Sequence, residues 1–278
     1  MLHPRLTLDS LGLAATKSRG QNFLVNSSRA ENIVAIAAPG PNDLVVEIGA
    51  GLGALTRPLL ETGAGVLAYE IDRGLLQYLR ESLLPDYPDR LVVMDQDALT
   101  IDYREIAAGS ERKLLVIGNL PYLISTPILF SLVENRTLID RAVLMFQQEL
   151  ADRLMAGPGT KVYGRLSVML GYYADISRAM NLGPADFFPR PKVGSTILKL
   201  TFKTNPEPKL ESPVLFQRLV AAAFGQRRKT LRNALSAVFP QPHLDEALVK
   251  ADIDPKRRAE TLSVFEYALV ANSWPKAT

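Results

Sequence analysis

The 278-residue chain contains no cysteine and only two histidines, His3 and His243. Without cysteine it can form no disulfide framework, thiolate zinc site or cysteine nucleophile, and a cytoplasmic location is the simpler expectation. With so few histidines, a zinc-activated hydrolase or deaminase is not expected either. We therefore expect no metal site, and the chemistry we look for needs neither a metal ion nor a covalent intermediate.

Long apolar runs are missing as well. No stretch approaches eighteen apolar residues, and the N-terminus lacks the apolar segment of a signal peptide, so we expect neither secretion nor a membrane span. With 47% hydrophobic and 22% charged residues, the composition is that of an ordinary globular protein rather than a disordered one. The length allows one large domain and a small one.

An excess of charge of one sign is almost absent, because the formal net charge is only +3. Residues 1–204 hold 21 basic and 21 acidic side chains, whereas residues 205–278 hold 11 basic and 8 acidic ones. The densest basic cluster contains Arg227, Arg228, Lys229 and Arg232, with no acidic residue between Phe224 and Val238. Such a cluster is usually a solvated helix face, but like charges this close together also indicate an external anion, for instance a phosphate backbone.

The first two thirds of the chain alternate between strand-like and helix-like patterns. After a lead-in of residues 1–25 and a helix from the cap residue Asn26 to Ala38, we expect strands at 44–48, 66–71, 91–94, 114–117 and 141–146, with helices at 53–61, 73–83 and 125–134 between them. Further helices are expected around 147–156 and 164–174, and two longer strands, 176–182 and 195–202, read as an antiparallel edge pair. The alternation predicts an α/β fold with a doubly wound, mainly parallel, seven-stranded sheet.

A proline-rich linker, residues 204–213, ends this pattern. Beyond it only short helices are expected, at 214–224, 230–238, 244–251 and 262–271. The sequence therefore predicts a catalytic domain of residues 1–204 and a small, all-helical C-terminal domain of residues 205–278.

A glycine-rich turn follows the first expected strand. Gly49 and Gly51 allow the backbone to approach a ligand closely at the start of a helix. The same spacing also satisfies the loose dinucleotide pattern, with Glu70 about where a ribose-binding acid would lie. By itself, this stretch does not show whether the ligand is a nicotinamide cofactor or an adenosyl cofactor. It is also consistent with a turn that binds no ligand.

Polar residues follow the next three expected strands. Glu70 can accept hydrogen bonds from both ribose hydroxyls, and Asp97 can accept one from an adenine amino group. Each acid alone is more often a solvated loop residue, but at successive strand ends they indicate one adenosine-shaped crevice. The fourth strand ends in Asn119-Leu120-Pro121-Tyr122, which taken alone is as consistent with a turn as with a site.

This order of segments resembles the S-adenosylmethionine-dependent ribosomal RNA adenine N6,N6-dimethyltransferases, and most closely their bacterial members. Leu120 departs from the Asn/Asp-Pro-Pro-Tyr/Phe signature of related nucleobase methyltransferases, but it is the form found in this branch. The resemblance runs from about residue 18 to about residue 272, and five segments carry it in order: 20–24, 119–122, 187–193, 226–233 and 257–262.

The resemblance implies a Rossmann-like class I methyltransferase with S-adenosyl-L-methionine as its cofactor. It implies that the element containing Asn22 and Leu24 closes over the methionine end of that cofactor, and that Asn119 contacts both cofactor and target. The implied reaction transfers methyl groups to N6 of two adjacent adenines in a hairpin near the 3′ end of small-subunit ribosomal RNA, on an immature subunit. We expect Arg227, Arg228, Lys229 and Arg232 to bind RNA, no membrane partner, and a monomer.

The chemistry of an amino group explains the residues at the fourth strand. The adenine N6 lone pair is delocalised into the ring, so hydrogen bonds to the Asn119 side-chain carbonyl and the Leu120 main-chain carbonyl would favour a pyramidal, nucleophilic nitrogen. Pro121 would hold that carbonyl outward. Tyr122 and Phe187 could stack on opposite faces of the extruded base, and each stacking contact is worth about 1–3 kcal/mol.

Three alternatives remain at this point. The first is the related large-subunit adenine methylase that gives macrolide resistance, which the complete helical domain disfavours. The second is a ribosome-assembly or nucleic-acid-binding factor that keeps the fold without catalysis, which the intact 119–122 segment disfavours. A nicotinamide-dependent dehydrogenase is the most distant.

Overall fold

The computed structural model describes residues 2–16, 20–121 and 124–275. The contacts divide the chain into two compact units, residues 1–151 with 176–202, and residues 152–175 with 203–278. No helix in the described part of the chain is long and apolar enough to cross a membrane.

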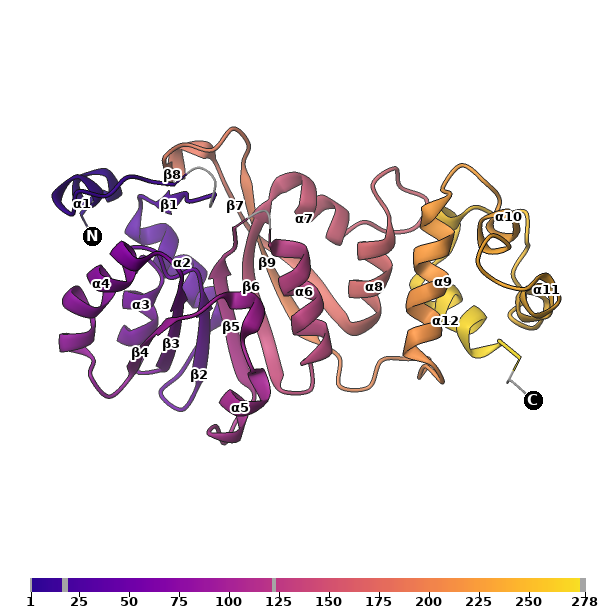
Figure 1. Ribbon diagram of the computed structural model, residues 1–278, viewed down its shortest axis with the longest axis horizontal. Coiled ribbons are helices and arrows are strands. Elements are labelled where there is room, and N and C mark those ends of the chain that lie inside the picture. The colour runs from indigo at the N-terminus through magenta and orange to yellow at the C-terminus, as the bar shows by residue number, and fades with distance from the viewer. Residues whose placement is uncertain (1, 17–19, 122–123, 276–278) are drawn as a thin grey trace. The chain divides into compact units, whose positions relative to one another are not determined.

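The first unit is built on a seven-stranded sheet in the order β4-β3-β2-β5-β6-β9-β7 (Figure 1). Adjacent strands are parallel from β4 to β6, and β9 runs antiparallel to β6. The strands are β2 (Leu44–Ile48), β3 (Gly65–Glu70), β4 (Leu91–Asp95), β5 (Leu114–Asn119), β6 (Ile139–Gln147), β7 (Ala174–Leu182) and β9 (Ser195–Phe202). The predicted doubly wound, mainly parallel α/β sheet is confirmed.

The two longer strands, expected as an edge pair, are neighbours at one edge of the sheet, with β9 beside β6 and β7 outermost. Their burial fits these positions: most of β9 is buried, whereas most residues of β7 are exposed or half-buried.

Most helices of this unit match the predicted segments. They are α2 (Ser27–Ala37), α3 (Thr56–Glu61), α4 (Arg73–Ser82), α5 (Tyr103–Ala108), α6 (Ser125–Glu134) and α7 (Gln148–Leu154). The Asn26 side chain caps α2 by accepting a hydrogen bond from the Ser28 N–H at 2.9 Å. Helix α3 begins at Thr56 rather than at the expected Gly53, because Gly49, Gly51 and Gly53 all have positive φ, which a right-handed helix excludes.

Helix α5 was not expected, and neither were three further short elements. The lead-in contains a short helix, α1 (Pro4–Ser10), and a short strand, β1 (Phe23–Leu24), which pairs antiparallel with β8 (Phe187–Phe188). In this ribbon Phe23 is opposite Phe188, and Leu24 is opposite Phe187. The ribbon therefore joins the segment before the first sheet strand to the loop between β7 and β9.

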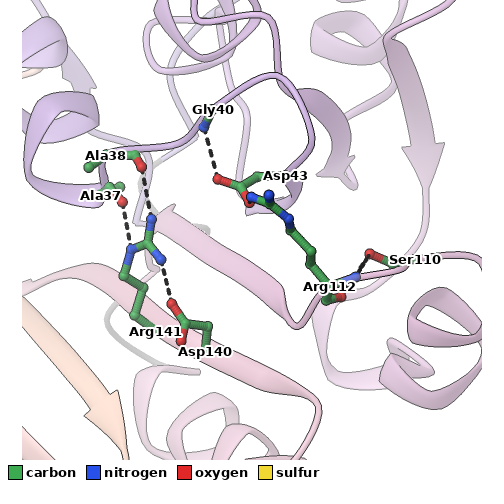
Figure 2. A network of polar contacts seen from close by, with 8 residues as sticks. All are labelled: Ala37, Ala38, Gly40, Asp43, Ser110, Arg112, Asp140 and Arg141. Carbon is green, nitrogen blue, oxygen red and sulfur yellow. Dashed lines mark hydrogen bonds and ion pairs between the residues drawn. The ribbon is translucent and has the colours of Figure 1, made fainter.

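Polar contacts tie α2 to the amino ends of the central strands (Figure 2). The Arg141 guanidinium donates to the Ala37 and Ala38 carbonyls at 2.7 and 2.8 Å and pairs with Asp140. Beside it, Asp43 accepts from the Gly40 N–H at 2.9 Å and pairs with Arg112 at 3.4 Å. These groups adjoin the starts of β2, β5 and β6. Structural contacts therefore occupy this end of the sheet, and a ligand is expected at the opposite end.

The second unit is helical, with α8 (Arg165–Tyr173), α9 (Pro213–Gly225), α10 (Leu231–Leu235), α11 (Gln241–Lys250) and α12 (Val264–Asn272) (Figure 1). Helix α8 belongs here because Tyr172 packs against Phe216 of α9, with ring centroids 5.1 Å apart, and donates its hydroxyl to the Pro208 carbonyl at 2.7 Å. The last crossing between the two units is at 202/203, two residues before the expected boundary at 204/205, and residues 152–175 group with the C-terminal helices.

Candidate active site

A cavity lies at the carboxyl ends of β2, β3, β4 and β5, within the first unit. Its walls come from the segment before β1, the glycine-rich turn, and the residues that follow the three neighbouring strands. This is where an open α/β sheet is expected to bind its ligand. The polar or predicted residues that line it are Gln21, Asn22, Leu24, Glu47, Gly49, Gly51, Glu70, Gln96, Asp97, Asn119 and Pro121.

The glycine-rich turn brings bare backbone to the cavity wall. Gly49 and Gly51 have φ values of +75° and +58°, and a Cβ on Gly49 would lie 3.3 Å from the Asn119 carbonyl oxygen. A Cβ on Gly51 would lie 3.2 Å from the Phe23 ring. Side chains at these two positions would therefore be strained and crowded, which explains why glycine is used here.

Glu70 is a buried acid held by main-chain N–H groups. Its Oε2 accepts from Gly51 N at 2.9 Å, and its Oε1 accepts from Ile71 N and Asp72 N at 2.9 and 3.0 Å. A carboxylate has about four lone-pair positions, so these bonds leave one free, on Oε2. The expected contact with both ribose hydroxyls is thus reduced to one ordinary acceptor position, because backbone groups occupy the other three.

Asp97 lies at the cavity rim in an exposed turn. Its Oδ1 accepts from Leu99 N at 2.9 Å and caps the short helical turn Ala98–Thr100. This capping bond fixes the direction of the side chain, and Oδ2 is the atom available to a ligand. The structure therefore brings Glu70 and Asp97 to one cavity, as predicted from their strand ends.

Asn119 ends β5 with its amide held in one orientation. Its Nδ2 donates to the main-chain carbonyl of Asn22 at 2.8 Å, which directs Oδ1 away from that carbonyl. Leu120 is buried, and Pro121 lines the cavity. Tyr122, predicted to stack on the base, lies outside the residues that the structure describes.

Phe187 lies in the main core of the first unit. Its side chain is 2% exposed and packs in the main core with Leu24 and Ile197, and it is not among the described residues that line the cavity. Its partner Leu24 does contribute to the lining. Strand alternation explains this burial: in the β1–β8 ribbon, Phe187 points to the main core, whereas Phe188 packs beside Phe23 in a separate apolar cluster.

Glu47 is a site residue that we did not predict. It is 1% exposed, it lines the cavity, and its Oε2 has no hydrogen-bond partner among the described residues. Burial raises the pKa of Glu47 to about 7; the Thr56 hydroxyl opposes the shift, and the Glu70 carboxylate adds to it. The available signal was an acid inside the otherwise apolar strand β2.

The basic cluster is partly neutralised from elsewhere in the second unit. Arg232 forms a bidentate pair with Asp245 at 2.6 and 2.7 Å, which lowers the pKa of Asp245. Arg227 donates to the Lys161 carbonyl at 2.7 Å and lies 3.8 Å from Glu260. No acidic residue lies between Phe224 and Val238, and these two partners come from more distant positions in the sequence. Arg228 and Lys229 are exposed.

The charge of the cavity distinguishes between ligand classes. Among the described lining residues three are acidic, namely Glu47, Glu70 and Asp97, and none is basic. Such a wall favours a cationic ligand and disfavours the pyrophosphate of a dinucleotide. The residues present fit S-adenosylmethionine, which carries a sulfonium and an ammonium group. Gly49 and Gly51 let the backbone approach this cofactor closely, and Glu70 and Asp97 can accept hydrogen bonds from its adenosine. The described part of the chain contains no group of side chains that could hold a metal ion.

Comparisons with known proteins show what the chain is similar to. A profile of the family described as "Ribosomal RNA adenine dimethylase" matches residues 12–276. The chain is similar to the ribosomal RNA small subunit methyltransferase A of Moorella thermoacetica, with 45% identity over 270 residues, 94% of this chain and 93% of the relative. It is also similar to the protein of that name from Anaeromyxobacter sp. (strain K), with 44% identity over 275 residues, 95% of each.

Solved structures give the same fold. A dimethyladenosine transferase from Plasmodium falciparum superposes with a TM-score of 0.77 at 27% identity, covering 89% of this chain and 95% of that one. The 23S rRNA methyltransferase ErmE superposes with a TM-score of 0.71 at 24% identity, covering 91% and 99%, and shows a shared fold.

Proposed function

The chain belongs to the ribosomal RNA adenine dimethylase family, and from this premise we propose that its substrate is two adjacent adenines in a hairpin near the 3′ end of small-subunit ribosomal RNA. The enzyme is an S-adenosylmethionine-dependent rRNA adenine dimethyltransferase that converts N6 of each adenine to N6,N6-dimethyladenine. We further propose that it acts on an immature small subunit in the cytoplasm, as a monomer. The relatives named for small-subunit methylation are 44–45% identical to this chain, whereas the 23S rRNA methyltransferase ErmE is 24% identical, which supports this choice over the large subunit.

The cofactor supplies an electrophilic sulfonium methyl group when bound. The proposal assigns its ribose to the free lone pair of Glu70 Oε2, its adenine to Asp97, and its methionine end to the wall formed by Asn22, Leu24, Gly49 and Gly51. Oε2 of Glu47, which has no partner among the described residues, is a further acceptor at this wall, and a cationic ligand would favour the ionised form of this acid. Each of these residues lies on the one cavity.

One observation carries the assignment of the target site: Asn119 Nδ2 is bound to the Asn22 carbonyl. The amide oxygen is therefore the atom left to accept a hydrogen bond from an incoming amine. A second acceptor, the Leu120 carbonyl, would draw the N6 lone pair out of conjugation with the ring. Much of the catalysis is then positional, an effect that can reach roughly 7–11 kcal/mol.

We assign stacking on the target base to Tyr122. Phe187 would have to leave the core to cover the opposite face, so we assign it instead to packing beneath the β1–β8 ribbon. For RNA, the second unit offers Arg228 and Lys229, which are exposed. Arg227 and Arg232 are paired within the unit and shape the surface that presents them.

The proposed function is tested by methyl incorporation into undermethylated small and large subunits, with Asn119→Ala as the inactive variant. We expect incorporation into small subunits only, and a loss of at least 100-fold in kcat for Asn119→Ala. Asn135→Ala is the matched control, because the Asn135 amide also donates to a main-chain carbonyl, that of Ser131, at 2.9 Å and away from the cavity. Full activity of Asn119→Ala would remove this residue from the mechanism.

The alternatives give different results in the same assay. Incorporation into large subunits would indicate the macrolide-resistance type of methylase. If binding alone supported subunit maturation, cells that carry Asn119→Ala would assemble subunits normally, which would favour a non-catalytic assembly factor.

A further inference from the structure

Gln21 uses both ends of its side-chain amide inside the protein. Its Oε1 accepts from the Thr16 N–H at 2.7 Å, and its Nε2 donates to Asp72 Oδ2 at 3.3 Å. The side chain is half-buried and lines the cavity. A single residue thus ties the segment before β1 to the start of helix α4.

Asp72, the partner of Gln21, also contacts Glu70, the acid proposed to bind the ribose. Its Oδ1 caps α4 by accepting from Gly74 N and Leu75 N at 3.0 and 3.3 Å. Its own N–H donates to Glu70 Oε1 at 3.0 Å. The position of Asp72 is therefore fixed by the helix cap and by Glu70, so Gln21 is anchored to a rigid group.

The residue after Gln21 reaches the other side of the cavity. The Asn22 carbonyl accepts from Asn119 Nδ2 at 2.8 Å, and the Asn22 side chain donates to the Gly20 carbonyl at 2.9 Å. If the Asn22 carbonyl moved away, the Asn119 amide could rotate and present its NH₂ group to the target amine, which also consists of donors. The orientation that accepts from the amine depends on where this carbonyl lies.

We infer that Gln21 is a positioning residue for methyl transfer: by tying Thr16 to Asp72, it holds the Asn22 carbonyl where that carbonyl orients the Asn119 amide. The inference rests on the proposed role of Asn119 as an acceptor for the target amine. It makes residues 20–24 more than a wall of the cofactor cavity, since the same segment sets the geometry of the amine-binding oxygen. Gln21 itself touches neither the target nor the transferred methyl group.

The first test compares Gln21→Ala with Gln77→Ala by steady-state kinetics on small subunits. Gln77 is the matched control, because its Nε2 also donates to a carboxylate, Glu81 Oε1 at 2.8 Å, on the exposed face of α4. We expect Gln21→Ala to lower kcat at least 10-fold, with a smaller change in KM for the cofactor and only a small decrease in the melting temperature from the two lost hydrogen bonds. Gln77→Ala should behave like the wild type. An unchanged kcat for Gln21→Ala would overturn the inference.

An exchange of donor and acceptor separates positioning from general stability. In Gln21→Glu the acceptor for Thr16 N–H remains, but the new carboxylate faces Asp72 and cannot donate to it. Adding Asp72→Asn preserves the helix cap and supplies an amide donor toward that carboxylate. We expect the double variant to recover kcat to within about threefold of wild type, whereas Gln21→Glu alone stays at least 10-fold lower. If the double variant is no better than Gln21→Glu, the Gln21–Asp72 contact is not what matters.

A spectroscopic measurement tests the inference without methyl transfer. The side-chain NH₂ signals of Asn119 in an amide NMR spectrum are identified by their loss in Asn119→Ala. Gln21→Ala should shift them and Gln77→Ala should not, with and without S-adenosylmethionine. If the wild type fails to methylate small subunits while these signals respond, the proposed function fails and the positioning stands. If methylation occurs and the signals do not respond, the inference fails and the function stands.

Discussion

At the scale of single residues, the cavity combines acids in three different states. Glu70 is buried but satisfied by three N–H groups, Asp97 is exposed and caps a turn, and Glu47 is buried with one oxygen unpartnered. A buried carboxylate without partners is costly to ionise, so it gains most from a cationic ligand. The three acidic side chains therefore contribute differently to the binding of one ligand.

Glu47 should leave a signature in the stability of the unliganded protein. Its pKa is about 7 in the folded protein, against 4.5 as its ordinary value, so the folded state holds the proton more tightly than the unfolded state does. The contribution of Glu47 to the free energy of unfolding is therefore largest below pH 4.5 and is lost as pH rises toward 7. The loss is on the order of 3 kcal/mol.

Urea unfolding of the wild type and Glu47→Gln between pH 5 and pH 8 measures this effect. We expect the stability of the wild type relative to Glu47→Gln to fall as pH rises to about 7 and then to level off. A difference that stays constant over this range would show that Glu47 titrates well below it.

Sequence reasoning at this scale found the residues that stand at strand ends. Glu70, Asp97 and Asn119 were predicted because a parallel sheet gathers the carboxyl ends of its strands at one edge. The burial of Phe187 was not predicted, because its direction depends on pairing with Leu24, a contact between residues far apart in the sequence. Glu47 was missed because an acid inside a strand has no fixed meaning until its burial is known.

At the scale of elements, the two ends of the sheet have different tasks. The carboxyl ends bear the cavity, and the amino ends bear the Arg141 network (Figure 2). Ala38 closes α2 in a left-handed conformation with φ of +48°, and Arg141 holds the last carbonyls of that helix. Charged donors to helix carbonyls stabilise the helix end.

Arg141→Met should therefore affect stability rather than chemistry. The change removes two charge-assisted hydrogen bonds to α2, and we expect the free energy of unfolding to fall by about 2–3 kcal/mol. Chemical denaturation measures this loss, and calorimetric titration of S-adenosylmethionine should show an unchanged affinity for the folded protein. A large loss of cofactor affinity with no loss of stability would contradict this division.

The basic cluster contains two arginines paired within the unit, Arg227 and Arg232, and two further exposed cations, Arg228 and Lys229. Arg228→Gln combined with Lys229→Gln should weaken binding to small-subunit RNA and reduce the slope of log affinity against log salt by about one per residue removed. The melting temperature should not change. Filter binding over a salt series measures the slope, and an unchanged slope would show that these side chains contact no phosphate.

Arg232→Gln should do the reverse, because Arg232 is already engaged by Asp245. We expect the melting temperature to fall by about 1–3 °C, as for a partly exposed ion pair, with little change in the salt slope. A scanning thermal measurement beside the same binding assay gives both values. A full unit of lost slope without destabilisation would show that the pair opens to bind RNA.

At the scale of the whole molecule, the chain passes between its two compact units several times. The proline-rich linker lies beside the last crossing only. Residues 152–175 also belong to the second unit, because Tyr172 and Tyr173 pack there. Nothing local distinguishes these tyrosines from residues of the sheet domain, since their partner Phe216 lies beyond the linker. The fold class was predictable from periodicity, whereas the division into units required contacts between distant segments.

A fragment of residues 1–204 should accordingly fail to behave as a domain. It keeps α8 but loses α9 and α12, against which that helix packs. We expect the fragment to bind a hydrophobic dye strongly and to aggregate, while the full chain does neither. A soluble, monomeric fragment that binds S-adenosylmethionine as tightly as the full chain would contradict this.

We propose that the tip of β5, with the oriented amide of Asn119, holds the adenine amino group that is methylated. Primer extension on small-subunit RNA, after incubation of undermethylated subunits with the wild type or with Asn119→Ala, tests this role of Asn119. We expect stops at two adjacent adenines near the 3′ end with the wild type and none with Asn119→Ala. Stops at another position with the wild type, or the same stops with Asn119→Ala, would contradict it.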